Sequence, residues 1–154
     1  MGFKAIVLDM DGTLYDLYNI DNWLEDLRAE NVRPFVVGSP LYDIDELNLV
    51  LDMLRRCGYR IIINSWTPMG ASKDFCKEVK RTKKEWLNRV GLKVDEIHIT
   101  KYGTTKADAT RKYKGYQVLV DDNDLVRAGW SLGYTINPTR GDLIFQLLEL
   151  VRKE

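Results

Sequence analysis

The sequence has few histidines and cysteines, so chemistry that depends on an imidazole or a thiolate has few candidate residues. It contains one histidine, His98, and two cysteines, Cys57 and Cys76. A structural zinc site takes four ligands drawn mainly from these two residue types, so the composition argues against one, and we interpret His98 as a structural residue. The cysteines lack paired spacing, and we interpret them as reduced thiols.

Excess charge and long apolar runs are also absent. Basic and acidic residues number 23 each, so the formal net charge is zero and there is no bulk-charge argument for nucleic-acid binding. No apolar run approaches the roughly 18 residues of a membrane span, and the first residues lack the build of a signal peptide. We therefore expect a cytoplasmic protein, and the length of 154 residues favours a single domain over 1–154.

Short apolar runs alternate with helical patterns along the chain. Three of the runs have polar residues only at their ends, which is typical of strands buried on both faces of a parallel sheet. We predict an α/β fold: a three-layer, Rossmann-like parallel sheet of about five strands with helices on both faces. The predicted strands span 3–9, 60–65, 96–100, 116–121 and 134–137, and the main helices span 45–57, 72–90, 125–132 and 142–153.

One stretch breaks this alternation. About 35 residues separate the first strand from the helix at 45, and they hold a short predicted helix (21–30) and an irregular piece (31–42). In an α/β sheet the chain leaves each strand over the ligand crevice, so an insertion there is well placed to act as a lid. We expect a small cap at about 15–43. Its aromatic residues either stack on a base or form the cap's own core: Tyr18, Trp23, Phe35 and Tyr42.

Acidic residues follow the first strand in the sequence Asp9-Met10-Asp11-Gly12-Thr13. Residues i and i+2 of an extended chain point to the same side, roughly 6.6 Å apart, so Asp9 and Asp11 are expected to face one pocket. Gly12 lets the backbone turn sharply, and Thr13 offers a hydroxyl or an amide.

A second acidic group, Asp121-Asp122, follows the fourth predicted strand, and Asp124 is expected to cap the next helix. Two acidic clusters at equivalent strand ends suggest an oxygen-ligand site for a hard cation, most simply Mg²⁺. The carboxylates of Asp9, Asp11, Asp121 and Asp122 would carry four negative charges. Phosphate binding there would require a metal ion and a raised pKa on one aspartate.

Two further polar groups are expected at the same rim. Ser65 ends the second strand, with Thr67 as the alternative hydroxyl, and Lys106 follows a Gly-Thr-Thr loop, with Lys101 as the alternative lysine. The long helix also carries a basic face, which we interpret as solvated, with substrate steering as the alternative: Lys73, Lys77, Lys80, Arg81 and Lys84.

This order of motifs resembles the haloacid dehalogenase-like (HAD) phosphohydrolases. The resemblance rests on D-x-D-G-T after the first strand, a serine after the second, a later lysine, and D-D after the fourth, together with a small cap of the superfamily's first class. A softer similarity points to the 5′(3′)-deoxyribonucleotidase branch. The resemblance implies a Mg²⁺-dependent phosphatase of small phosphorylated substrates, including nucleoside monophosphates.

The resemblance also implies roles for individual residues. Asp9 would be the nucleophile that forms an aspartyl-phosphate, and Asp11 the general acid and base, lending its backbone carbonyl to Mg²⁺. Ser65 would hydrogen-bond the phosphoryl group and Lys106 would neutralise its charge. Mg²⁺ would be held by Asp9, Asp11 and Asp122, with Asp121 helping, and substrate would contact Gly12, Thr13 and Trp66.

Two other functions stay open. One is a phosphatase acting on a polynucleotide 3′ end, a nucleic-acid partner that the small cap would admit. The other is a non-catalytic phospho-acceptor module. Receiver domains also cluster acids, a hydroxyl and a lysine, but their phosphorylated aspartate follows the third strand, which here ends in Ile99-Thr100.

Overall fold

A computed structural model of the chain describes residues 2–154 and arranges five strands in one parallel sheet. The strands are β1 (Phe3–Leu8), β2 (Tyr59–Trp66), β3 (Glu96–Thr100), β4 (Gly115–Val120) and β5 (Thr135–Ile136). Their order across the sheet is β3-β2-β1-β4-β5, with β1 at the centre. The predicted fold is confirmed, and each strand end lies within one residue of its predicted position.

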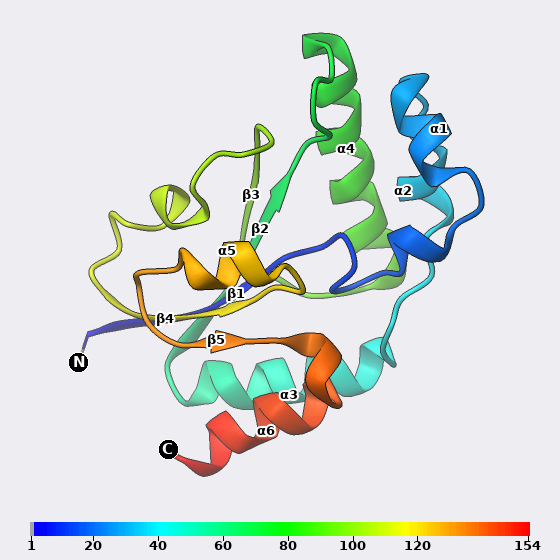
Figure 1. The fold of residues 1–154 in the computed structure, drawn as a ribbon. Coiled ribbons are helices and arrows are strands. Elements are labelled where there is room, and N and C mark those ends of the chain that lie inside the picture. The colour runs from blue at the N-terminus through cyan, green and yellow to red at the C-terminus, as the bar shows by residue number, and fades with distance from the viewer. Residues whose placement is uncertain (1) are drawn as a thin grey trace.

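Helices fill the connections between the strands. The α-helices are α1 (Trp23–Arg28), α2 (Arg33–Val37), α3 (Ile44–Arg56), α4 (Lys73–Val90), α5 (Asp124–Ala128) and α6 (Leu143–Arg152). Short 3₁₀ helices are η1 (Leu17–Asn19), η2 (Lys106–Ala109) and η3 (Pro138–Arg140). In Figure 1, α3 and α6 lie side by side, α2 lies beside α4, and α1 lies beside α2.

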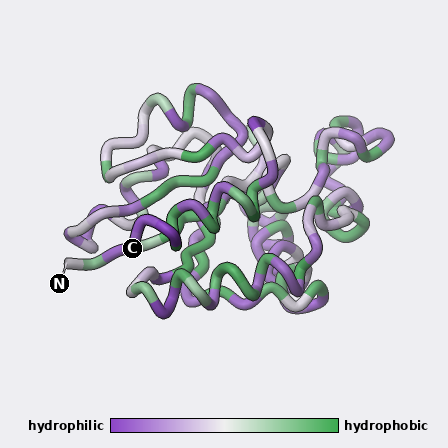
Figure 2. Tube along the Cα trace, turned by 90° about the horizontal axis from the view of Figure 1, so that it is seen from below, coloured by the Kyte–Doolittle hydropathy of each residue, from purple (hydrophilic) through white to green (hydrophobic). Residues whose placement is uncertain are grey.

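Apolar residues of the strands alternate between two cores. Ile6 and Leu8 of β1 belong to the larger core, together with buried side chains of α3, α4 and α6. Ala5 and Val7 face the smaller core, which includes Ala107 of η2 and extends beyond α5. Strands covered on both faces need apolar side chains on both faces, which explains the continuous apolar runs in the sequence. Along the helices, hydrophilic and hydrophobic residues alternate (Figure 2).

Three local predictions are wrong. The segment 31–42, expected to be irregular, contains α2, which begins with a proline in its first turn, where the missing N–H removes no helical hydrogen bond. The helix predicted at 125–132 is the shorter α5, and its N-cap is Asn123, not Asp124. The Asn123 side chain accepts hydrogen bonds from two backbone N–H groups of α5, while Asp124 pairs with Arg127 in the helix's first turn.

Among the helices of residues 2–154, none combines the length and the apolar character that crossing a membrane requires. Cys57 and Cys76 are both free thiols.

Candidate active site

The carboxyl ends of β1, β2 and β4 open into a cavity of about 390 Å³. Its acidic end is lined by Asp9, Asp11, Asp121 and Asp122, with Lys106 among them. The opposite wall comes from η1, α1 and α2, within the segment expected to form a cap.

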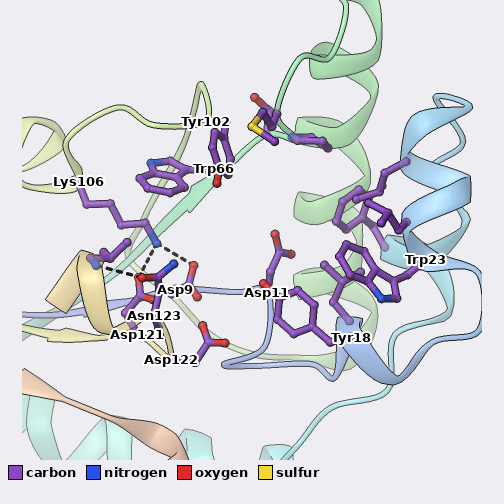
Figure 3. A pocket seen from close by; sticks show the side chains of 18 of the residues that line it. Asp9, Asp11, Tyr18, Trp23, Trp66, Tyr102, Lys106, Asp121, Asp122 and Asn123 are labelled. Carbon is purple, nitrogen blue, oxygen red and sulfur yellow. Dashed lines mark hydrogen bonds and ion pairs between the residues drawn. The ribbon is translucent and has the colours of Figure 1, made fainter.

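The central contact of the site joins Asp9, Lys106 and Asp121. In the parallel ladder Leu8 pairs with Val120, so Asp9 and Asp121 follow at neighbouring positions of two adjacent strands. The Lys106 Nζ lies 2.8 Å from Asp9 Oδ1 and 2.7 Å from Asp121 Oδ2, as the dashed lines in Figure 3 show. The Asn64 side-chain amide, fully buried in β2, donates to the backbone oxygen of Lys106 at 2.8 Å. The lysine is therefore positioned by the sheet itself.

Burial shifts the ionisation of these groups. Burial raises the pKa of Asp9, and the charge of Lys106 offsets this only in part. Burial alone would lower the pKa of Lys106, but the carboxylates of Asp9 and Asp121 outweigh it and raise that pKa. Burial, with the charges of Asp9 and Asp121, also raises the pKa of Asp122 to about 7. The charge argument from the sequence requires at least one aspartate with a raised pKa, and here the pKa is raised for both Asp9 and Asp122.

The donor set suits a hard divalent cation. Carboxylate oxygens of Asp9, Asp121 and Asp122 all lie within 4.8 Å of one another, and oxygen ligands are those that Mg²⁺ prefers. Gly12 makes this arrangement possible: its φ is +74°, and a Cβ there would collide with the Asp122 carboxylate and lie 2.7 Å from the Tyr18 ring. The Asp11 carboxylate is not part of the group.

Asp11 instead faces a second buried lysine, Lys83 of α4, which the sequence analysis missed. The Lys83 side chain is fully buried, and its Nζ lies 3.1 Å from Asp11 Oδ2 and 2.8 Å from Ser65 Oγ. A signal was present in the sequence. Position 83 continues the apolar stripe of Phe75 and Val79 at a spacing of four, so a lysine there points into the core.

Several predicted site residues lie elsewhere than expected. Ser65 does not line the cavity, because its hydroxyl is buried against Lys83, whereas Thr67 does line it. Within the described residues, the buried Thr67 hydroxyl has no hydrogen-bond partner. The Thr13 hydroxyl is also buried, donates to Asp9 Oδ2 at 3.1 Å, and does not reach the cavity. Lys101 is exposed.

Gly12 likewise does not line the cavity, whereas Trp66 does. The Trp66 indole donates to the Thr104 backbone oxygen at 2.9 Å, and its ring meets that of Tyr102 edge to face, with centroids 5.0 Å apart.

Aromatic rings form much of the remaining wall. Tyr18 and Trp23 meet edge to face with centroids 5.1 Å apart and line the cavity together with the buried Phe35. Tyr42 lies outside it. Arg28 of α1 is the cation that lines the cavity besides Lys106.

Comparisons with known proteins agree with this architecture. No protein-family model and no curated protein matches the sequence. Among solved structures, a chain in the Pnkp1/Rnl/Hen1 complex aligns over 88% of this protein with 18% identity and a TM-score of 0.58. A Mesorhizobium loti protein described as a HAD-like phosphatase aligns over 99% with 14% identity and a TM-score of 0.57.

The two alignments differ in how much of the other protein they cover. This chain spans 45% of the chain in the Pnkp1/Rnl/Hen1 complex and 87% of the Mesorhizobium loti protein. The order of the strands and the two similar structures together define the fold as HAD-like α/β. The resemblance noted in the sequence is confirmed at the level of the fold.

Proposed function

We propose that the protein is a Mg²⁺-dependent phosphomonoesterase that works through an aspartyl-phosphate intermediate. The observation that carries the proposal is the buried Asp9 carboxylate, which lies at the end of the central strand of a HAD-like sheet, paired with Lys106 and next to Asp121 and Asp122. Phosphoryl transfer depends mainly on positioning and charge stabilisation, and this arrangement supplies both.

The chain's own residues divide the reaction between them. A carboxylate oxygen of Asp9 forms a bond to phosphorus while the ester oxygen leaves and takes a proton from Asp11. Water then attacks phosphorus and gives its proton to Asp11, and the Asp9–phosphorus bond breaks to release phosphate. Lys106 neutralises the charge of Asp9 and of the phosphoryl oxygens.

The remaining roles follow the geometry of the cavity. Mg²⁺ held by Asp9, Asp121 and Asp122, with the backbone carbonyl of Asp11, would neutralise negative charge and orient the phosphoryl group. We assign the hydrogen bond to the phosphoryl group to Thr67 in place of Ser65, because Thr67 lines the cavity and its buried hydroxyl has no partner among residues 2–154.

Two residues that do not line the cavity support those that do. Thr13 orients Asp9 through its hydroxyl, and Gly12 leaves room for the Asp122 carboxylate. We propose no direct substrate contact for either of them, and we keep Trp66 as a substrate contact because its side chain lines the cavity.

The substrate we propose is a small phosphate ester with an aromatic group, such as a nucleoside monophosphate. We propose that the protein acts on it in the cytoplasm. Tyr18 and Trp23 belong to the segment 15–43, which we propose acts as a small cap, and with Trp66 and Tyr102 they offer ring faces to a base.

A second candidate is a phosphatase of polynucleotide 3′ ends. It is favoured by the similarity to the Pnkp1/Rnl/Hen1 complex, whose Pnkp1 is a polynucleotide kinase-phosphatase. The exposed basic face of α4 would then contact backbone phosphates, and turnover would fall steeply with added salt.

The test is phosphate release, with Mg²⁺ and with EDTA, from deoxynucleoside 5′- and 3′-monophosphates, a 3′-phosphorylated oligonucleotide, sugar phosphates and an aryl phosphate. We expect Mg²⁺-dependent release, with nucleoside monophosphates above sugar phosphates. A preference for the oligonucleotide would select the second candidate. No release from any ester, together with stable phosphorylation of Asp9 by a phosphoryl donor, would favour the phospho-acceptor module.

A further inference from the structure

Lys83 is a buried cation whose hydrogen-bonding capacity is fully used. Its side chain has no solvent exposure, and its three ammonium protons meet Asp11 Oδ2 at 3.1 Å, Ser65 Oγ at 2.8 Å and the Trp66 backbone oxygen at 2.8 Å. Taking an ammonium group out of water is costly unless a carboxylate and further acceptors replace the water. Of these partners only Asp11 carries a charge.

Asp11 is held from two directions. Lys83 contacts Oδ2, while the hydroxyl of Tyr15 donates to Oδ1. Tyr15 is fully buried, and burial together with the Asp11 charge raises its pKa well above the usual range. The phenol therefore stays protonated and remains a donor to Asp11.

These two donors are themselves fixed by the segment 15–43 and by α4. The Lys83 Nζ lies 4.9 Å from the centroid of Phe35 in α2, and the Tyr15 ring packs against Phe35 and Trp86. The Trp86 indole donates to the backbone oxygen of Gly38 at 2.7 Å. The position of Asp11 is thus tied to the packing of α2 on α4.

We propose that Lys83 is a positioning residue that holds the Asp11 carboxylate at the cavity wall, apart from the carboxylates of Asp9, Asp121 and Asp122. Without a cation at this position, Asp11 would be free to rotate away from the leaving group. The proposal rests on the function proposed above, in which the Asp11 carboxylate takes a proton from the attacking water and passes that proton to the leaving oxygen of the next substrate.

The first test uses esters whose leaving groups differ in their need for a proton. General-acid catalysis is worth about 10²–10⁴-fold, and a poor alkoxide leaving group needs it more than 4-nitrophenolate does. For Lys83→Met we expect kcat to fall about 10- to 100-fold on an alkyl phosphate and only about threefold on 4-nitrophenyl phosphate, with KM little changed. Lys93→Met, at an exposed lysine just beyond α4 that does not line the cavity, is the matched control and should change neither rate. Equal losses on both esters would overturn the proposal.

The second test asks whether Lys83 acts through Asp11. In an Asp11→Asn background, Lys83→Met should lower kcat by less than about twofold, because interacting residues are not additive. Independent losses that multiply would show that Lys83 acts by another route. Tyr15→Phe keeps the buried ring but removes the other donor to Asp11. It should also lower kcat more on the alkyl phosphate than on 4-nitrophenyl phosphate, by a smaller factor, and it serves as the test if Lys83→Met fails to fold.

A third measurement does not depend on activity. In a thermal double-mutant cycle, Lys83→Met should lower the melting temperature by several degrees in the parent protein and by clearly less in the Asp11→Asn background. If no ester is hydrolysed but this coupling is found, the proposed function fails while the Lys83–Asp11 link stands. Equal shifts in both backgrounds would overturn the link itself.

Discussion

Two buried lysines mark two differently built sides of the same cavity. Lys106 bridges two carboxylates that come from adjacent strands, Asp9 and Asp121. Lys83 comes from a helix and meets one carboxylate, Asp11, with a hydroxyl and a carbonyl oxygen. Asp9 and Asp11 are only two residues apart, but β1 ends at Leu8. The chain then turns, so the two carboxylates face different cations.

The comparison changes the charge balance of the site. Four carboxylates with Lys106 alone would leave three negative charges, whereas a second lysine leaves two, which one Mg²⁺ balances. The side built on Lys106 is suited to hold metal and phosphoryl group. The side built on Lys83 is suited to hold the group that moves a proton. The following changes separate the two sides.

The largest effect is expected for Asp9→Asn. The change removes the nucleophile and one unit of repulsion, so turnover should fall by at least about 10⁴-fold while the fold is kept. Phosphate release measures turnover, and the far-ultraviolet circular dichroism spectrum shows whether the fold is kept. A folded variant with near-normal turnover would remove Asp9 from its role.

Thr67→Val is expected to rank next. It keeps the shape of a buried side chain but removes an unpartnered hydroxyl from a residue that lines the cavity. Loss of one donor to a transition state costs about 10²–10³-fold in kcat. Ser65→Ala is the matched comparison, since Ser65 contacts Lys83 and not the cavity, and its loss should be smaller. The reverse ranking of the two variants would return the phosphoryl contact to Ser65.

Asp122→Asn should act mainly on metal affinity. Loss of even an indirect partner of a metal typically costs about 10–100-fold in affinity, so the Mg²⁺ concentration for half-maximal rate should rise by at least the lower figure. The rate at saturating Mg²⁺ should fall much less. An unchanged metal requirement would exclude Asp122 as a ligand.

The smallest effect concerns pH and stability. The pKa of Asp122 rises from its usual 3.8 to about 7, so between these values the folded, metal-free protein binds a proton that the unfolded chain has lost. Stability in EDTA should therefore fall as pH rises from 4 to 8, by roughly 1–2 kcal/mol after allowance for solvent screening. Thermal melts should show this slope, and Mg²⁺ or Asp122→Asn should flatten it. Stability that rises over this range in EDTA would contradict the shift.

The sheet and much of the acidic site were predictable because local signals specify them. Buried parallel strands are continuously apolar, and acids at their ends are visible in the sequence. Lys83 was missed because its partners lie in other elements, 17 to 72 residues away in the chain. The sequence left Ser65 and Thr67 as alternatives at the cavity wall. The choice between them could not be predicted, because it depends on which hydroxyl the buried lysine contacts.

The helix α1 contains no buried residue, although three of its side chains that line the cavity, Trp23, Leu24 and Leu27, are apolar. The carboxylates follow the central strands, where a substitution would disturb the packing of the core. Trp23 and Leu27 pack against the larger core, whereas Leu24 does not, so Leu24 is the position on α1 where a substitution would reshape the cavity wall with the least risk to folding. Under the proposed function, such a substitution would change which esters fit the cavity without changing the carboxylates.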